Sequence, residues 1–370
     1  GCIIFLFGSS YHYFKITHEY YYILLWILNG LVQSTGWPTS VKIMGKWFGE
    51  NHAGFIFGIW SANASVGNIV GAAMVSFVHN NGYNDEWMFY LPAFQLIILS
   101  IFIFLFIRTE PLKWGIQLNQ AESQHNDHEK LISEMNDTDI NDNDDTQNKI
   151  SFLTALFLPN VITYALCYAC LKSVNYTMFF WLPYFLDGVF PENVSDNLSI
   201  VYNIGQILGG WVCGWISDYL HRRSPPVFIF LLIAIPPIFL LRIKSHSQIF
   251  FGILSGLAGF FIGGPANIIS SAISADLGKH KSLMGNTAAL ATVAGIIDGT
   301  GSFGAAICQY IVSLLSDISW DLVFVVLTVL LLASALLILK LTIKETKFLF
   351  KYGRKESDEI EKKYGVQAQE

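Results

Sequence analysis

Charged side chains are scarce in this chain of 370 residues. Asp, Glu, Lys and Arg make up 14% of it, against about 25% in an average globular protein. Hydrophobic residues make up 53%, and a soluble fold of this length cannot bury so much apolar surface. The composition therefore excludes a disordered chain and an ordinary soluble enzyme. It predicts an all-α protein that crosses the lipid bilayer several times.

Two further absences narrow the class of protein. The net charge is −6, so no basic surface for nucleic acid is expected. The five cysteines all lie in apolar stretches, which indicates neither a disulfide framework nor a zinc site. Cys167 and Cys170 are spaced like a redox pair, but membrane packing is the favoured interpretation inside an apolar helix. Without a phosphate-binding loop or a metal cluster, we expect no cofactor and no enzymatic reaction.

Apolar windows of about twenty residues, the length of a membrane-spanning helix, recur along the chain. They predict nine spans, near 21–44, 54–77, 88–107, 157–186, 198–217, 227–241, 248–273, 283–312 and 322–343. Residues 1–14 resemble the end of a tenth. One set of connecting segments, together with the span ends beside them, carries 18 of the 22 basic residues: 45–53, 108–156, 218–226, 274–282 and 344–370. The positive-inside rule assigns that side to the cytosol.

The stretch 108–156 is the long hydrophilic interruption. Nine acids and two lysines lie between 121 and 150, so we interpret 108–156 as a flexible cytosolic linker. The spacing of the acids does not fit an EF-hand loop. The linker divides the chain into an N-terminal bundle (1–107), a C-terminal six-helix bundle (157–343) and a cytosolic tail (344–370). The first bundle is shorter by about eighty residues, or two and a half spans with loops.

A signature stands between two spans of the second bundle. Gly214 permits close helix approach. Asp218 is suited to accept hydrogen bonds from a neighbouring helix N-terminus, and Arg222 and Arg223 are suited to pair on the cytosolic side. This arrangement resembles the loop signature of the major facilitator fold, which has six plus six helices. The alternative is a solvated loop with an unrelated acid.

Longer runs resemble the sugar phosphate exchangers, eukaryotic relatives of bacterial organophosphate:phosphate antiporters. They are NGLVQSTGWP (29–38), KWFG (46–49), GFIFGIW (54–60), SVGN (65–68), WLP (181–183), SADLG (274–278) and IDGTGS (297–302). The resemblance implies the major facilitator fold, here a partial third helix plus helices 4–12, with the first two helices missing. It also implies exchange of a phosphorylated sugar or glycerol phosphate for inorganic phosphate, in the endoplasmic reticulum membrane.

Two charged residues lie at the middle of predicted spans, where a charge is costly and predicts function. Lys172 is at the centre of 157–186 and Asp298 at the centre of 283–312. In the functional interpretation Lys172 binds a phosphate dianion, and Asp298 holds Lys172 when the site is empty. In the structural interpretation the two residues only neutralise each other.

The resemblance also identifies departures from the antiporter pattern. Those antiporters bind phosphate with two arginines, and the second aligns with Asn175, one helical step after Lys172 and next to Tyr176. Lys172 is able to replace that arginine, but without its two-pronged geometry. The substrate histidine of the fifth-helix signature aligns with Ala64. Either Asn63 beside it contributes a neutral hydrogen bond, or the substrate differs.

We therefore predict an organophosphate:phosphate exchanger that works by alternating access. Two alternatives stay open. One is a transporter of another organic anion on the same fold. The other is a membrane scaffold that does not transport.

Overall fold

The computed structural model describes residues 1–47, 53–107, 152–243, 245, 247–278 and 287–364. Every regular element within these ranges is a helix, as the composition predicts. Five helical stretches are long and apolar enough to cross a membrane: Phe55–His79, Trp87–Phe106, Gln248–Gly278, Leu290–Ser316 and Trp320–Lys351. Other predicted spans form helices that are shorter or carry more polar residues, such as the long helix that contains Lys172.

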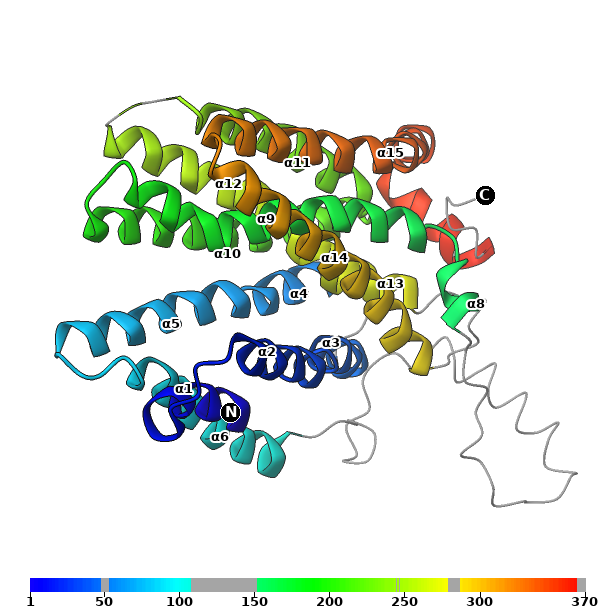
Figure 1. Cartoon of the computed structure of the whole chain (residues 1–370). Coiled ribbons are helices and arrows are strands. Elements are labelled where there is room, and N and C mark those ends of the chain that lie inside the picture. The colour runs from blue at the N-terminus through cyan, green and yellow to red at the C-terminus, as the bar shows by residue number, and fades with distance from the viewer. Residues whose placement is uncertain (48–52, 108–151, 244, 246, 279–286, 365–370) are drawn as a thin grey trace, which may run out of the picture.

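Six helices are described in the first half, and they occupy the lower part of Figure 1. They are α1 (Cys2–Phe14), α2 (Glu19–Gln33), α3 (Gly36–Trp47), α4 (Ala53–Ser61), α5 (Asn63–Asn80) and α6 (Trp87–Phe106). The predicted span 21–44 is interrupted between α2 and α3 because Pro38 has no N–H to donate to the carbonyl of Ser34. The predicted span 54–77 is interrupted at Ala62.

The second half begins with the short α8 (Phe152–Leu156), so the last five residues of the predicted linker are helical. The rest of that linker lies outside the described residues. The helices that follow are α9 (Val161–Asp187), α10 (Glu192–Leu220), α11 (Ser224–Leu240), α12 (Gln248–Ile268), the π-helical turn η2 (Ile269–Ile273), α13 (Ser274–Gly278), α14 (Thr287–Ser316) and α15 (Trp320–Tyr364). The predicted tail is therefore helical up to residue 364.

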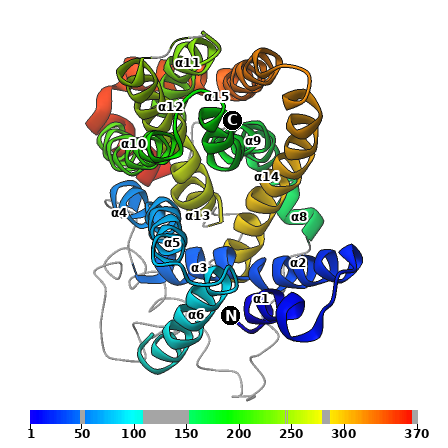
Figure 2. The same ribbon diagram turned by 60° about the vertical axis from the view of Figure 1, so that its left-hand side comes forward.

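The two halves face each other, with α1–α6 below and α9–α15 above in Figure 2. They touch where α4 crosses α10 and where α3 meets α14. The Trp37 indole donates to the carbonyl oxygen of Ser270 over 3.0 Å, which joins α3 to η2. A Cβ on Gly58 of α4 would lie 2.5 Å from the carbonyl oxygen of Gly210 in α10. Glycine at this crossing lets the two backbones touch.

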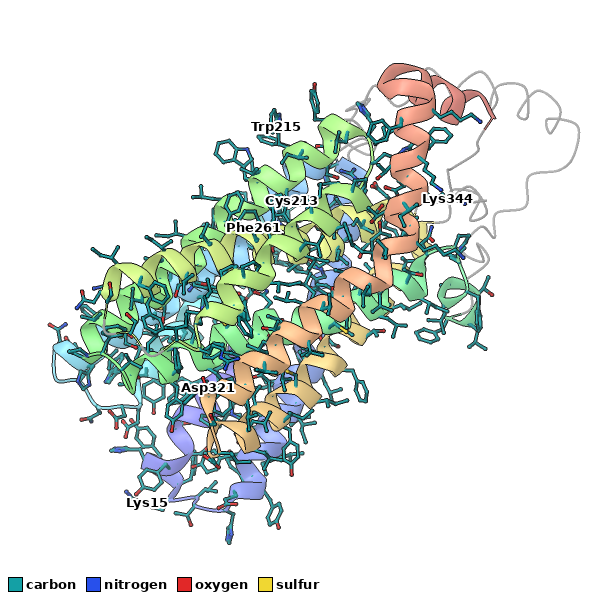
Figure 3. The ribbon with its side chains drawn as sticks, turned by 90° about the horizontal axis from the view of Figure 1, so that it is seen from above. Lys15, Cys213, Trp215, Phe261, Asp321 and Lys344 are labelled. Atoms are coloured by element: carbon teal, nitrogen blue, oxygen red, sulfur yellow. The ribbon has the colours of Figure 1, made fainter. Side chains whose placement is uncertain are left out.

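The buried core lies mainly in the second half, between α9, α10, α11, α12, α14 and α15. The outer surface remains apolar, and Phe104 of α6 is 86% exposed. A surface this apolar fits contact with lipid. Lys15 and Asp321 lie at one end of the molecule and Lys344 lies at the other, as Figure 3 shows.

Candidate functional site

A buried ion pair joins α9 to α14, which pack side by side. Lys172 is 3% exposed. Its Nζ atom lies 2.6 Å from Oδ1 of Asp298 and donates to Oγ of Ser302 over 2.9 Å. The Asp298 side chain is 24% exposed. The carboxylate therefore remains accessible on its outer side, while the ammonium lies beneath it.

Aromatic rings flank the ammonium group. The Nζ atom of Lys172 lies 5.4 Å from the ring centroid of Tyr168 and 5.2 Å from that of Tyr176. These tyrosines lie four residues before and after Lys172, on the same face of α9. Their π faces stabilise a cation that is shielded from water.

Glycine at position 301 makes room for this arrangement. A Cβ there would lie 2.5 Å from Cδ1 of Tyr168 and 2.9 Å from Cδ of Lys172. The glycine lets α14 approach α9 closely enough for Asp298 and Ser302, on either side of it, to reach the ammonium. The site therefore brings a cation, a carboxylate and a hydroxyl into contact.

Asn175 lies one helical step along α9 but faces α10. Its Oδ1 accepts hydrogen bonds from the hydroxyl of Tyr202, over 2.9 Å, and from Nε2 of Gln206. Ser65 of α5 donates to Oε1 of Gln206 over 2.9 Å. These hydrogen bonds form a buried path from the first half to α9. Asn175 and Lys172 thus have different partners, although three residues separate them.

The structure brings Lys172, Tyr176 and Asp298 together but leaves Asn63 apart from them. Asn63 begins α5 in the first half and is exposed. Its Nδ2 donates to the carbonyl oxygen of Trp60, 2.7 Å away on its own segment.

The signature residues form a network at the end of α10. Oδ2 of Asp218 accepts the backbone N–H of Phe55, in the first turn of α4, over 2.6 Å. Oδ1 of Asp218 lies 2.7 Å from Nη1 of Arg223, whose Nε lies 2.7 Å from Oδ2 of Asp276. Burial opposes the charge of Arg223, but the carboxylates of Asp276 and Asp218 outweigh it and raise the pKa of the guanidinium. Arg223 therefore stays charged and ties α10 to α13.

The other two signature residues are also buried. Gly214 lies inside α10. The guanidinium of Arg222 lies 4.9 Å from the ring centroid of Phe348 in α15. Arg222 and Arg223, adjacent in sequence, therefore contact different helices.

Comparison with known proteins places this architecture in a family. The profile of the Major Facilitator Superfamily matches residues 1–297. Sugar phosphate exchanger 3 of Bos taurus is 43% identical over 358 residues, which cover 93% of this chain and 72% of that protein. Sugar phosphate exchanger 3 of Xenopus laevis is 41% identical over 361 residues, which cover 93% and 71%. Glucose-6-phosphate exchanger SLC37A2 of Xenopus laevis is 35% identical over 368 residues, which cover 94% and 73%.

The chain belongs to the sugar phosphate exchanger family of the Major Facilitator Superfamily. The predicted family and the predicted all-α membrane fold are confirmed. The protein is a multi-pass membrane protein, and its relatives are exchangers of the same superfamily.

Some residues of the site in this exchanger family member are not predicted from the sequence. Ser302 lies one helical turn after Asp298, a spacing that places both on one face of α14. Ser302, Asp276 and Ser65 all lie in runs that carry the family resemblance, which assigns none of them a role. A search for polar residues at helical spacing would have found Ser302, whereas the partner of Asp276 depends on how helices pack.

Cysteines and acidic residues of the described chain serve other contacts. The described part of the chain contains no group of three His, Cys, Asp or Glu residues placed to hold a metal ion. Cys167 and Cys170 carry free thiols. The Cys167 thiol is buried and lies 3.1 Å from the hydroxyl of Ser334 in α15, a contact between packed helices.

Proposed function

We propose that this protein exchanges a phosphorylated sugar or glycerol phosphate for inorganic phosphate by alternating access. The observation that carries the proposal is the buried Lys172, whose ammonium lies 2.6 Å from the partly exposed carboxylate of Asp298. A charged side chain inside a membrane helix is costly. A buried lysine at this position is therefore first considered a functional residue. The relatives named as sugar phosphate and glucose-6-phosphate exchangers support the choice of substrate.

The proposed cycle exchanges one anion for another at Lys172. In the empty site Asp298 neutralises the ammonium. An entering phosphate dianion takes its place, since a compact ammonium binds phosphate as a point charge. Ser302, already 2.9 Å from the ammonium, donates its hydroxyl to the phosphate. Tyr176 lines the same site, and no covalent bond forms or breaks.

Two predicted site residues take subordinate roles in this proposal. Asn175 couples movements of α9 to Ser65 in the first half through Gln206. Its Oδ1 already accepts a hydrogen bond from Gln206, which in turn accepts one from Ser65. Asn63 contacts substrate only if α5 moves toward α9 during the cycle. The signature residues Gly214, Asp218, Arg222 and Arg223 act on conformation, since Asp218 and Arg223 tie α10 to α4 and α13.

The proposed setting is the endoplasmic reticulum membrane, with the linker and the C-terminal tail in the cytosol. The excess of basic residues on that side supports the orientation. Lys15 and Lys344 lie at opposite ends of the molecule (Figure 3), as this topology requires.

Uptake by proteoliposomes that contain the full-length protein tests the proposal. Labelled phosphate is supplied outside, with glucose 6-phosphate, glycerol 3-phosphate or buffer trapped inside. We expect uptake to rise with trapped organophosphate and to be lost in Lys172→Gln. Lys15→Gln, an exposed lysine far from the site, serves as the matched control and should retain uptake. If trapped organophosphate does not stimulate uptake by the wild-type protein, the exchange proposal is wrong.

One observation favours a second candidate, the transport of another organic anion. Asn175 stands where the resemblance implies a phosphate-binding arginine, and Ala64 stands where it implies a histidine. Binding at Lys172 alone suits a carboxylate as well as a phosphate, because a single ammonium lacks geometric selectivity. Competition of unlabelled carboxylates against labelled phosphate separates the two candidates. Normal biological activity of Lys172→Ala without any uptake would instead support a scaffold.

A further inference from the structure

The last helix, α15, presents a lipid-facing surface that runs into a stripe of lysines. Val329, Leu332 and Leu336 are 58%, 46% and 58% exposed. Beyond them on the same helical face come four lysines spaced by four, three and four residues: Lys340, Lys344, Lys347 and Lys351. This spacing keeps the four ammonium groups within one stripe of an α-helix. Lys340, Lys347 and Lys351 are exposed, and Lys344 is half-buried.

Other side chains of the same segment attach it to the protein. Oε2 of Glu345 accepts the backbone N–H of Ser224, at the start of α11, over 3.1 Å. The ring of Phe348 lies 4.9 Å from the guanidinium of Arg222. These two contacts fix the rotation of this segment of α15, and three of its four lysines are exposed.

The length of α15 places the stripe at the membrane surface. Twenty residues from Trp320 to Leu339 rise about 30 Å, which is the thickness of the bilayer hydrocarbon core. Trp320 fits one interface, where indole rings collect. Lys340 and the residues after it then lie among the lipid headgroups at the other surface of the bilayer. Near Lys344 the helix also bends away from the direction of the bundle (Figure 3).

We propose that Lys340, Lys344, Lys347 and Lys351 form a binding site for the headgroups of anionic phospholipids. The stripe continues a surface that already faces acyl chains, so a lipid lying along α15 meets apolar side chains first and ammonium groups next. Phe350, 87% exposed, adds an aromatic ring at the same level, as interfacial helices do. Clusters of lysines at this position attract anionic lipids. The inference does not depend on which solute the protein transports.

Bound lipid would hold the end of α15 against the signature loop. Glu345 lies within the same helical turns as the lysines, so a bound headgroup would restrain the segment whose Glu345 accepts the backbone N–H of Ser224. Arg223 directly precedes Ser224 and pairs with Asp218 and Asp276, and Arg222 before it also belongs to the signature. The lipid site thus adjoins the residues that tie α10 to α4.

Native mass spectrometry of the purified protein in detergent tests this proposal. Phosphatidylserine or phosphatidylcholine is added at equal concentration, and bound lipids are counted. We expect the wild-type protein to bind phosphatidylserine in preference, and 0.5 M salt to weaken that binding. Combining Lys344→Gln, Lys347→Gln and Lys351→Gln should weaken it at least tenfold, since each surface lysine contributes about fivefold.

Controls separate charge at this site from general effects. Arginine at the same three positions should retain phosphatidylserine, and so should Lys15→Gln at the other end of the molecule. Unchanged melting temperatures show that the glutamine variant remains folded. Inorganic phosphate should not displace the lipid, because it makes no contact with the apolar face. The proposal is overturned if the glutamine variant binds phosphatidylserine like the wild type, if phosphatidylcholine binds equally, or if inorganic phosphate displaces the lipid.

Discussion

The Nζ atom of Lys172 lies 2.6 Å from Oδ1 of Asp298, although 126 positions separate the two residues in the chain. Each is the charged residue in the middle of its helix, and together they bring one positive and one negative charge into the interior. Such a pair is a modest source of stability, because removing both charges from water costs nearly what their attraction returns. Stability alone therefore gives little reason for the pair, which supports the proposed role of Lys172 in anion binding.

Replacement of Asp298 by asparagine should destabilise the empty protein and make it responsive to anions. The substitution leaves the ammonium of Lys172 buried without its counter-charge, which costs about 3 kcal/mol. Thermal unfolding in detergent should show a lower melting temperature, and added phosphate should restore part of it, because a bound anion stabilises the folded state. A double variant with Lys172→Gln should be more stable than Asp298→Asn alone. Equal melting temperatures of wild type and Asp298→Asn would contradict the coupling.

Gly301→Ala should disturb the site without changing any charge. The new Cβ would lie 2.5 Å from Cδ1 of Tyr168, so ring and lysine must shift, at a cost of about 1–3 kcal/mol. Gly299→Ala, on the same helix, is the matched control because nothing lies within 4 Å of its Cβ. We expect phosphate binding, measured by calorimetry, to weaken in the first variant and to persist in the second. If both variants weaken phosphate binding equally, the change in helix propensity is the cause, and the space beside Lys172 is not.

Asp218→Asn should loosen the contact between α10 and α4. The carboxylate accepts the backbone N–H of Phe55 over 2.6 Å and pairs with Arg223, and charged hydrogen bonds of this kind contribute about 1.5–3 kcal/mol each. We expect a lower melting temperature and faster hydrogen exchange in the first turn of α4. Asp321→Asn is the control, since the side chains of Arg242 and Asp321 are 38% and 47% exposed and lie 4.0 Å apart, so we expect almost no change.

Glu345→Ala should release the end of α15 from α11. The backbone N–H of Ser224 would lose the acceptor that it has in Oε2 of Glu345, and the turn that carries Phe348 would detach with it. Hydrogen exchange over residues 344–351 should become faster, while exchange in the rest of α15 should not change. Thr346→Ala next to it serves as the control. Unchanged protection in Glu345→Ala would mean that packing alone holds this segment.

The candidate site was only partly predictable from the sequence. Lys172, Tyr176 and Asp298 stood out because a charge or hydroxyl is conspicuous within an apolar run. Asn175 seemed to share a face with Lys172, but three residues along a helix turn a side chain by about 60°. That angle directs Asn175 to Tyr202 in α10 and Lys172 to α14. The division into bundles at the acidic linker stays a prediction, because 108–151 lie outside the described residues.

The sequence by itself determined the class of protein and the helical runs, since apolar content and helix formation depend on neighbouring residues. It also determined the family, through ordered motifs such as NGLVQSTGWP (29–38). Only the tertiary structure decided which charges pair. Asp298 with Lys172, Asp218 with the N-terminus of α4, and Glu345 with the start of α11 each join segments far apart in the chain. Their pairing depends on how the packed helices are rotated and at what angle they cross. Side chains from distant parts of the sequence jointly fix that rotation and angle.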